Sequence, residues 1–238
     1  MIIEKTEKGK IMSNNLFLIH YKPQNIAIRH RIFSSSVRQY FADNFPHPLF
    51  HNHNPDGKSI YRSKGSPFQF KVINNEVFIL ALNEGVDFAK SFQWPDEINM
   101  PLGHTGIIVG LKLCSKTSKQ ANFKQIEFRC YRNISPYIAL NQDKYKAYST
   151  LSECERRNAV EKGLVDHILT SAKWCEVTVS HQIQATLIQK KEGNPLKIKD
   201  ELFFTPFDVM FECNTEIPDY IGIGKFVSRG YGTMVQYG

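Results

Sequence analysis

Long apolar runs are missing from this sequence of 238 residues. No stretch approaches the roughly 18 consecutive apolar residues that a membrane-spanning helix needs. At the N-terminus, MIIEKTEKGK mixes charges of both signs where a secretion signal would carry an apolar core. We therefore expect a cytoplasmic protein that is neither exported nor in contact with a membrane.

Paired cysteines are missing as well. The five cysteines lie far apart and include no Cys-x-x-Cys pair; they are Cys114, Cys130, Cys154, Cys175 and Cys213. An odd, scattered set is typical of a reducing compartment and does not make a zinc ribbon. The sequence also lacks the nucleophile elbow that would accompany a Ser-His-Asp triad. On these grounds we expect no metal and no cofactor.

The apolar content is sufficient for a folded core. Apolar residues make up 42% of the chain and aromatic residues 12%, which argues against disorder. A chain of this length forms one large domain or two domains of about 110 to 120 residues each. The order of the predicted strands and helices decides between the two.

Positive charge is concentrated in the first half of the chain. The net charge is +7, and residues 20–71 contain many basic side chains but only two acids, Asp43 and Asp56. The basic residues of this stretch are Lys22, Arg29, Arg31, Arg38, Lys58, Arg62, Lys64 and Lys71, and its histidines are His20, His30, His47, His51 and His53. A basic, histidine-rich stretch suits a polyanion on which chemistry is done. The alternative is a solubilising surface, but the clustering favours nucleic acid.

The first half of the chain alternates strand-like and helix-like patterns. Apolar positions at helical spacing predict a first helix that starts at Asn25 and ends before Pro46. Asn74 and Asn75 tolerate positive φ and predict a hairpin turn. The predicted strands are 16–21, 60–73, 77–82 and 105–114, and the second helix is 86–93. This order, β-α-β-β-α-β, is that of one ferredoxin-like unit.

The second half repeats the pattern after a polar stretch at 115–122, which is typical of a linker. Thr150 and Glu153 predict a capping box ahead of a long helix that ends near Lys173. The predicted strands are 123–131, 176–190, 206–213 and 225–236, with turn residues at 192–195 and no visible second helix. We predict an α+β protein with a tandem ferredoxin-like fold (two β-α-β-β-α-β units), in which residues 1–119 and 120–238 form the two domains.

A glycine-rich loop, IGIGKFVSRGYG, stands near the C-terminus at 221–232. Its glycines are Gly222, Gly224, Gly230 and Gly232, and its polar side chains include Lys225, Ser228 and Arg229. Glycine lets a ligand approach the backbone closely, backbone amides can donate to phosphate oxygens, and the two cations add positive charge. The spacing fits neither a Rossmann fingerprint nor a Walker A loop. The alternative to a phosphate-binding loop is a tight structural turn.

The loop and several other segments resemble a known family. The pattern GxGKxxSRGxG before a terminal strand is similar to the signature of the CRISPR-associated RAMP superfamily. One branch of its pre-crRNA-processing endoribonucleases is similar in further segments. These are LFHNH (49–53), IYR (60–62), FQFKVI (68–73), LNEG (82–85) and SPYIALN (135–141). The matching segments follow the expected order along most of the chain.

This resemblance implies two ferredoxin-like folds and metal-independent cleavage inside a CRISPR repeat RNA, with the repeat transcript as the partner. The products would carry a 5′-hydroxyl and a 2′,3′-cyclic phosphate. The alternative is a non-catalytic RAMP-type RNA-binding subunit of a CRISPR effector complex, since it would share the fold and the glycine loop. Other effector subunits, and a second copy of the chain in a homodimer, stay open as partners.

The resemblance also points to histidines in the basic stretch as catalytic residues. Metal-free RNA cleavage needs a base for the 2′-hydroxyl proton, an acid for the leaving 5′-oxygen and a cation for the phosphorane. Histidine can act as acid or base near neutral pH, and on an extended chain His51 and His53 would lie about 6–7 Å apart. Tyr61 offers a third polar group. The candidate phosphate ligands nearby are Lys58, Arg62 and Lys64.

Two alternatives concern the same histidines. Histidines two residues apart can share a metal, but only Asp56 and no cysteine lies near them, which disfavours zinc. The second alternative is that His30, on the first predicted helix, replaces one of the pair. This would follow from the resemblance, because the catalytic histidine of the superfamily varies in position between branches.

Overall fold

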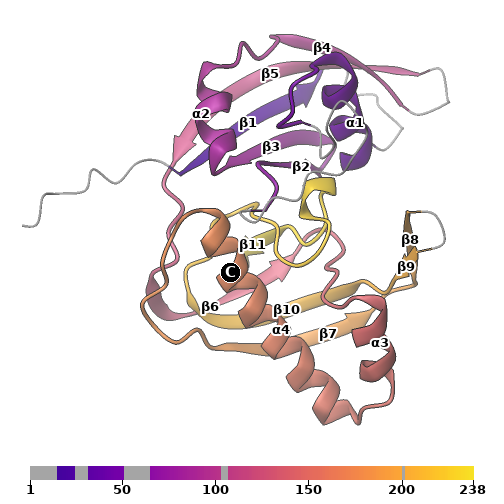
Figure 1. The fold of residues 1–238 in the computed structure, drawn as a ribbon, viewed down its shortest axis with the longest axis vertical. Helices are drawn as coiled ribbons and strands as arrows, with labels where there is room; N and C mark the ends of the chain where they lie inside the picture. Colours follow the sequence, from indigo (N-terminus) through magenta and orange to yellow (C-terminus); the bar gives the residue numbers. More distant parts are fainter. Residues whose placement is uncertain (1–14, 25–31, 51–64, 103–106, 200–201) are drawn as a thin grey trace, which may run out of the picture.

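The computed structural model describes residues 15–24, 32–50, 65–102, 107–199 and 202–238. Figure 1 shows two domains, one above the other, each built on its own antiparallel sheet. The predicted α+β class and the tandem ferredoxin-like fold are confirmed. None of the helices in these ranges is long and apolar enough to cross a membrane.

The N-terminal domain has the ferredoxin-like strand order with one strand added. Its elements are β1 (Leu16–Pro23), α1 (Ser34–Asn44), β2 (Phe68–Ile73), β3 (Glu76–Leu82), α2 (Glu84–Ser91), β4 (Glu97–Pro101) and β5 (Ile108–Lys119). The sheet order is β2-β3-β1-β5-β4, with antiparallel pairing throughout. Without the edge strand β4, this is the order of one β-α-β-β-α-β unit. The sequence pattern does not predict β4, because prolines bound this short, polar segment.

The local predictions for this domain have different outcomes. The hairpin turn is confirmed, because Asn74 and Asn75 join β2 to β3 with φ of +52° and +63°. The first helix begins at Ser34, after Phe33 with its extended backbone, so the helix predicted from Asn25 does not run through Phe33, and residues 25–31 lie outside the described residues. The linker prediction is wrong for residues 115–119, which continue β5 and pair with β1. Their polar side chains are exposed, so backbone pairing with β1 holds this part of the strand without an apolar face.

The N-terminal sheet is buried on both faces. Along β1, Ile19 and Tyr21 belong to the core of the N-terminal domain, whereas Leu16 and Leu18 belong to a core shared with the C-terminal domain. Successive strand residues point to opposite faces, so β1 is apolar on both. The shared core includes Leu164 of the long helix α4 (Glu153–Trp174). A common hydrophobic core therefore joins the two domains.

The C-terminal domain repeats the strand order without the second helix. Besides α4, its elements are β6 (Gln125–Asn133), α3 (Gln142–Ser149), β7 (Ala185–Glu192), β8 (Leu196–Lys199), β9 (Leu202–Phe204), β10 (Phe207–Thr215), the 3₁₀ turn η1 (Val227–Arg229) and β11 (Met234–Gln236). The sheet order is β11-β6-β10-β7. β8 and β9 form a separate hairpin that projects from the domain in Figure 1. Of the described residues between β10 and β11, only those of η1 are helical.

Three predictions for this half are corrected. The capping box of α4 is formed by Ser152 and Glu155 and not by Thr150 and Glu153. The strand predicted at 176–190 begins only at Ala185, because the chain turns after α4 with a positive φ at Glu176. The terminal strand predicted at 225–236 is limited to β11. Its first part is the glycine-rich loop, whose positive φ values are incompatible with a strand.

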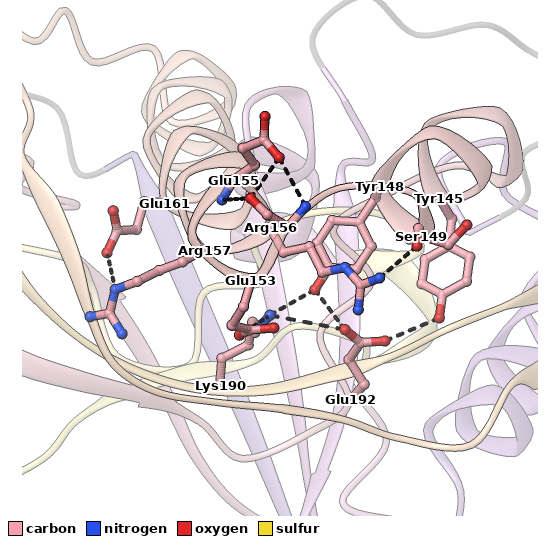
Figure 2. A network of polar contacts seen from close by, with 11 residues as sticks. Tyr145, Tyr148, Ser149, Glu153, Glu155, Arg156, Arg157, Glu161, Lys190 and Glu192 are labelled. Atoms are coloured by element: carbon pink, nitrogen blue, oxygen red, sulfur yellow. Dashed lines mark hydrogen bonds and ion pairs between the residues drawn. The ribbon is translucent and has the colours of Figure 1, made fainter.

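A polar network fixes α3 against α4 and β7 (Figure 2). Tyr148 donates to Glu192 over 2.6 Å, and Tyr145 donates to the other oxygen of the same carboxylate over 3.1 Å. Lys190 donates to the Tyr148 hydroxyl over 2.8 Å and pairs with Glu153 at 3.1 Å. The Lys190 side chain is only 10% exposed, which shields these charge-assisted bonds from water. The network thus sets the position of α3 relative to α4.

Candidate nucleic-acid interface

The glycine-rich loop, residues 221–232, lies between the two domains near the yellow C-terminal end of the chain in Figure 1. Gly224 and Gly230 have φ of +88° and +90°, a region that favours glycine. A Cβ at Gly224 would lie 2.7 Å from the Ile138 carbonyl oxygen, and a Cβ at Gly230 would collide with Ser34 of α1. The loop is therefore packed tightly against both domains.

Most glycine amides of this loop are used within the protein. The amides of Gly222, Gly230 and Gly232 donate to protein oxygens at 2.8, 3.1 and 2.9 Å. They are therefore not free to donate to a ligand in this structure. The polar side chains of the loop are half-buried; they are Lys225, Ser228 and Arg229. Contacts to a phosphate from this loop would thus come mainly from side chains.

Two buried polar residues of β2 support the loop. Gln69 accepts the hydrogen bond from the Gly222 amide, and Lys71 Nζ donates to the Val227 carbonyl oxygen over 3.3 Å. Lys71 is 1% exposed and has no carboxylate partner among the described residues. Burial lowers the pKa of its ammonium to about 7. The N-terminal sheet therefore positions a loop that belongs to the C-terminal domain.

A cavity of about 340 Å³ opens where α1, β8 and the glycine-rich loop meet, and we call it the interdomain cavity. Its walls include Ser34 and Ser35 at the start of α1, residues 196–198 of β8 and residues 229–231 of the loop. Both domains therefore contribute to one cavity, and its volume is in the usual range for ligand sites of about 300–1,000 Å³.

Positive charge dominates the interdomain cavity. Arg229 lines it and donates from Nη1 to the Ile198 carbonyl oxygen over 2.9 Å, which fixes the guanidinium. Burial and the charge of Arg229 lower the pKa of Arg38, so two guanidiniums lie close together. The N-terminus of α1 also opens here, and its partial positive charge favours an anion. Among the described residues that line this cavity there is no Asp or Glu. The arrangement suits a phosphate.

The β8–β9 hairpin extends this surface. The Phe204 ring lies 4.8 Å from the ring of Phe226 in the glycine-rich loop, and Lys197 lies over the Phe203 ring at 5.9 Å. Phe203 is 46% exposed, and exposed aromatic rings can stack on unpaired bases. The sequence pattern does not predict this hairpin, because both strands are short. The sequence signal for it is the turn at 192–195, followed by alternating lysines in LKIK.

The predicted catalytic residues lie outside the described residues. They are His51, His53 and Tyr61, together with the candidate phosphate ligands Lys58, Arg62 and Lys64 and the alternative histidine His30. On either side of segment 51–64, Phe50 is buried in the aromatic core of the N-terminal domain and Gly65 packs against Trp174 of α4. These roles stay predictions.

Two histidines of the basic stretch have structural environments, and the ring of His47 stacks on Phe88 at 4.1 Å. His20 lies 2.7 Å from a Glu76 carboxylate oxygen, and its ring stacks on Phe78 at 4.3 Å. Across the part of the chain that the structure describes, no group of three or more His, Cys, Asp or Glu side chains is placed to hold a metal ion.

Family models match both halves of the chain. The model of the Cas6b N-terminal domain matches residues 17–112, and the model of the Cas6b C-terminal domain matches residues 124–237. An uncharacterized protein of Methanocaldococcus jannaschii, MJ0978, is 38% identical over 106 residues, which is 44% of this chain and 71% of that protein.

Solved structures share this architecture. A crystal structure of Cas6b matches with a TM-score of 0.71 and 24% identity, and a crystal structure of the CRISPR RNA processing endoribonuclease Cas6b matches with 0.65 and 24%. Csf5, a crRNA endonuclease of CRISPR-Cas type IV, matches with a TM-score of 0.61 and 14% identity. Each match covers 94% of this chain and 100% of the other. At these identities, the structures establish the shared fold.

Proposed function

This chain belongs to the Cas6b family of CRISPR RNA-processing endoribonucleases, and from that premise we propose that it cuts CRISPR precursor RNA within the repeats without a metal ion. The nucleophile is the 2′-hydroxyl of the RNA itself. The products are a 5′-hydroxyl and a 2′,3′-cyclic phosphate. The observation that carries the proposal is the interdomain cavity, where a fixed guanidinium and the N-terminus of α1 offer one site for a phosphate.

RNA binding is assigned to the glycine-rich loop and the interdomain cavity. Arg229, Ser228 and Lys225 are the side chains proposed to contact phosphates. The tight packing of the glycines holds the loop between the domains, and Lys71 supports it from the N-terminal sheet. Because lysine and arginine contacts to phosphates release counterions, RNA affinity should fall steeply as salt rises.

Cleavage is assigned to the histidine stretch on the basis of its sequence. One of His51 and His53 takes the proton of the 2′-hydroxyl, while the other donates a proton to the leaving 5′-oxygen. The O2′–P bond forms as the P–O5′ bond breaks, so no water and no metal is consumed. Tyr61 is the third polar group of the site. The cations proposed to stabilise the phosphorane are Lys58, Arg62 and Lys64.

A denaturing gel of purified protein with end-labelled repeat RNA in excess EDTA tests the proposal. The expected result is one cut within the repeat, with a cyclic phosphate on the upstream product. A strict requirement for added Mg²⁺ or Mn²⁺ would contradict the mechanism and point to metal-ion catalysis. Tight RNA binding without cleavage under any condition would instead favour a non-catalytic RNA-binding subunit.

A further inference from the structure

A second cavity lies within the C-terminal domain, between α3 and α4. Its volume is about 370 Å³, and we call it the α3–α4 cavity. The polar side chains on its walls include Lys144 of α3 and Lys162, Asp166 and His167 of α4. None of these residues takes part in the proposed cleavage chemistry. The question is therefore what a cavity with these polar side chains could bind.

The glycine-rich loop is linked to this cavity through residues that pack between them. The amide of Lys225 donates to the Ile138 carbonyl oxygen over 3.0 Å, and Gly224 packs on the ring of Tyr137. The Tyr137 hydroxyl in turn lies 2.7 Å from Nδ1 of His167, which lines the cavity. The loop, Tyr137 and His167 thus form one continuous series of contacts.

Lysine side chains gather around His167. Burial lowers the pKa of His167 to about 4, with the charges of Lys225 and Lys144 acting in the same direction against that of Asp166. Burial and the charge of Lys144 also lower the pKa of Lys225, so these two ammoniums lie near each other. With Lys162 in the cavity wall, the lysines outnumber the nearby carboxylate. A concave site with such an excess of positive charge attracts an anion.

His167 fits an anion site as a neutral hydrogen-bond donor. Burial raises the pKa of the Tyr137 phenol, so Tyr137 keeps its proton and can donate it to Nδ1 of His167. In the tautomer in which Tyr137 donates, the neutral imidazole carries its own proton on Nε2, and this proton can be donated to a phosphate oxygen. The imidazole adds a hydrogen bond without adding a further positive charge to the cluster.

The walls of the α3–α4 cavity are fixed before a ligand arrives. Tyr148 lines the cavity, and its hydroxyl belongs to the network with Glu192 and Lys190 that holds α3 against α4 and β7 (Figure 2). A preformed site loses less conformational entropy on binding than a flexible one. Lys144 and Lys162 are therefore presented from two helices whose separation is already set.

We propose that the α3–α4 cavity binds a backbone phosphate of the RNA, held by Lys144 and Lys162 of its walls with His167 as a neutral donor, while the charge of Lys225 adds to the attraction. This inference rests on the proposed function, since it extends the RNA-binding surface of the same protein. The RNA strand then crosses the glycine-rich loop, with one phosphate in the interdomain cavity and another in the α3–α4 cavity.

The salt dependence of RNA binding tests this site. The variant Lys144→Ala/Lys162→Ala removes the two lysines of the cavity wall, and Lys173→Ala/Lys191→Ala is the matched control because it removes two exposed lysines of the same domain that do not line the cavity. Losing one phosphate contact with single-stranded RNA should reduce the slope of log K against log salt by about 0.7. We expect this change for the first variant and the wild-type slope for the control.

Equal slopes for the two variants would overturn the inference, as would a wild-type slope in the first variant. Inorganic phosphate, added at constant ionic strength, separates RNA from a free anion as the occupant. If the cavity belongs to RNA, phosphate competes weakly, and a phosphate that binds there without displacing RNA contradicts the inference. A wild-type protein that binds RNA but does not cut it would contradict the proposed function alone, because the slope measurement needs only binding.

Discussion

The two cations of the glycine-rich loop have different surroundings. Arg229 lines a cavity shared by both domains, where a carbonyl group holds its guanidinium and Arg38 lies nearby. Lys225 lies beside the helices of the C-terminal domain, near Lys144. The side of the loop that carries Arg229 therefore combines a fixed cation with residues of the N-terminal domain. The side that carries Lys225 offers lysine side chains without such a fixed guanidinium. We infer that the first side positions the RNA for cleavage and the second adds affinity.

The largest expected effect concerns the N-terminal contribution to cleavage. Alanine at His51 or His53 should reduce the cleavage rate by about 10² or more, the usual scale for losing a general acid or base. RNA affinity should change little, because a neutral imidazole adds little to phosphate attraction. The double variant should cost less than the product of the two single effects, because groups that act in one step are not additive. Single-turnover kinetics at saturating enzyme measures the cleavage rates of the single and double variants, and filter binding measures their RNA affinities.

Full activity in the double histidine variant would move the chemistry elsewhere, with His30 the next candidate. A loss of binding without a change in rate would make the two histidines phosphate ligands. Either result would contradict the inference that the Arg229 side positions the RNA for cleavage by these histidines.

The second prediction compares Arg229 with Lys225 directly, by the RNA affinity that each residue contributes. Arg229→Ala should weaken RNA binding by about 1.5–3 kcal/mol, the scale of a hydrogen bond to a charged group, and Lys225→Ala should weaken it less. Arg229→Lys should restore only part of the loss, because lysine lacks the planar fork of the guanidinium. Arg129→Ala, on an exposed position of β6, is the control for charge removal. Filter binding at one fixed salt concentration measures the loss of RNA affinity in each variant. Equal losses of affinity for the Arg229 and Lys225 variants would contradict the proposed difference between the two residues. No loss for either variant would mean that the loop is a structural turn.

The last prediction concerns the support beneath the loop and affects the stability of the protein, not cleavage or RNA affinity. The pKa of Lys71 in the folded protein is about 7, below its ordinary value of 10.5. Between these values the unfolded chain holds a proton on Lys71 that the folded chain has released, so the free energy of unfolding should rise with pH, by at most about 1.4 kcal/mol per pH unit. Below about pH 7 both states carry the proton and this contribution stays constant.

Lys71→Met should remove that pH dependence, whereas Lys112→Met, at an exposed position of β5, should keep it. Urea unfolding between neutral and alkaline pH measures the difference. The same pH dependence in both variants would mean that Lys71 is not held neutral between the domains.

More of the fold than of the candidate site could be predicted from the sequence. Local patterns such as the Asn74–Asn75 turn and the apolar strands are sufficient to order the elements of the ferredoxin-like unit in the first half, but not to predict the added edge strand β4. They fail where a strand is held by pairing alone, as at residues 115–119, and where glycines turn the chain away from a strand, as before β11. The helix α3 is mostly polar and has little apolar periodicity. The feature of the sequence that marks its start is Asn141, whose side chain caps the helix by accepting from the Lys144 amide.

The interdomain cavity depends on contacts that no local pattern encodes. The Gly222 amide donates to Gln69, and Arg229 lies near Arg38, although the two residues of each pair are more than 150 positions apart in the sequence. The glycine spacing predicts a loop near a phosphate, but it does not show that three of its amides are already engaged by the protein. Charge clustering identifies Arg38 only as one basic residue among many.

The most direct test of the account is a single 2′-deoxy substitution in the repeat RNA at the nucleotide that precedes the cut. The account predicts that the substituted RNA binds with nearly unchanged affinity and is not cleaved, because the attacking oxygen is gone while the phosphates remain. Cleavage of the substituted RNA at the same position and rate would show that another nucleophile attacks the phosphate, which would contradict the proposed mechanism.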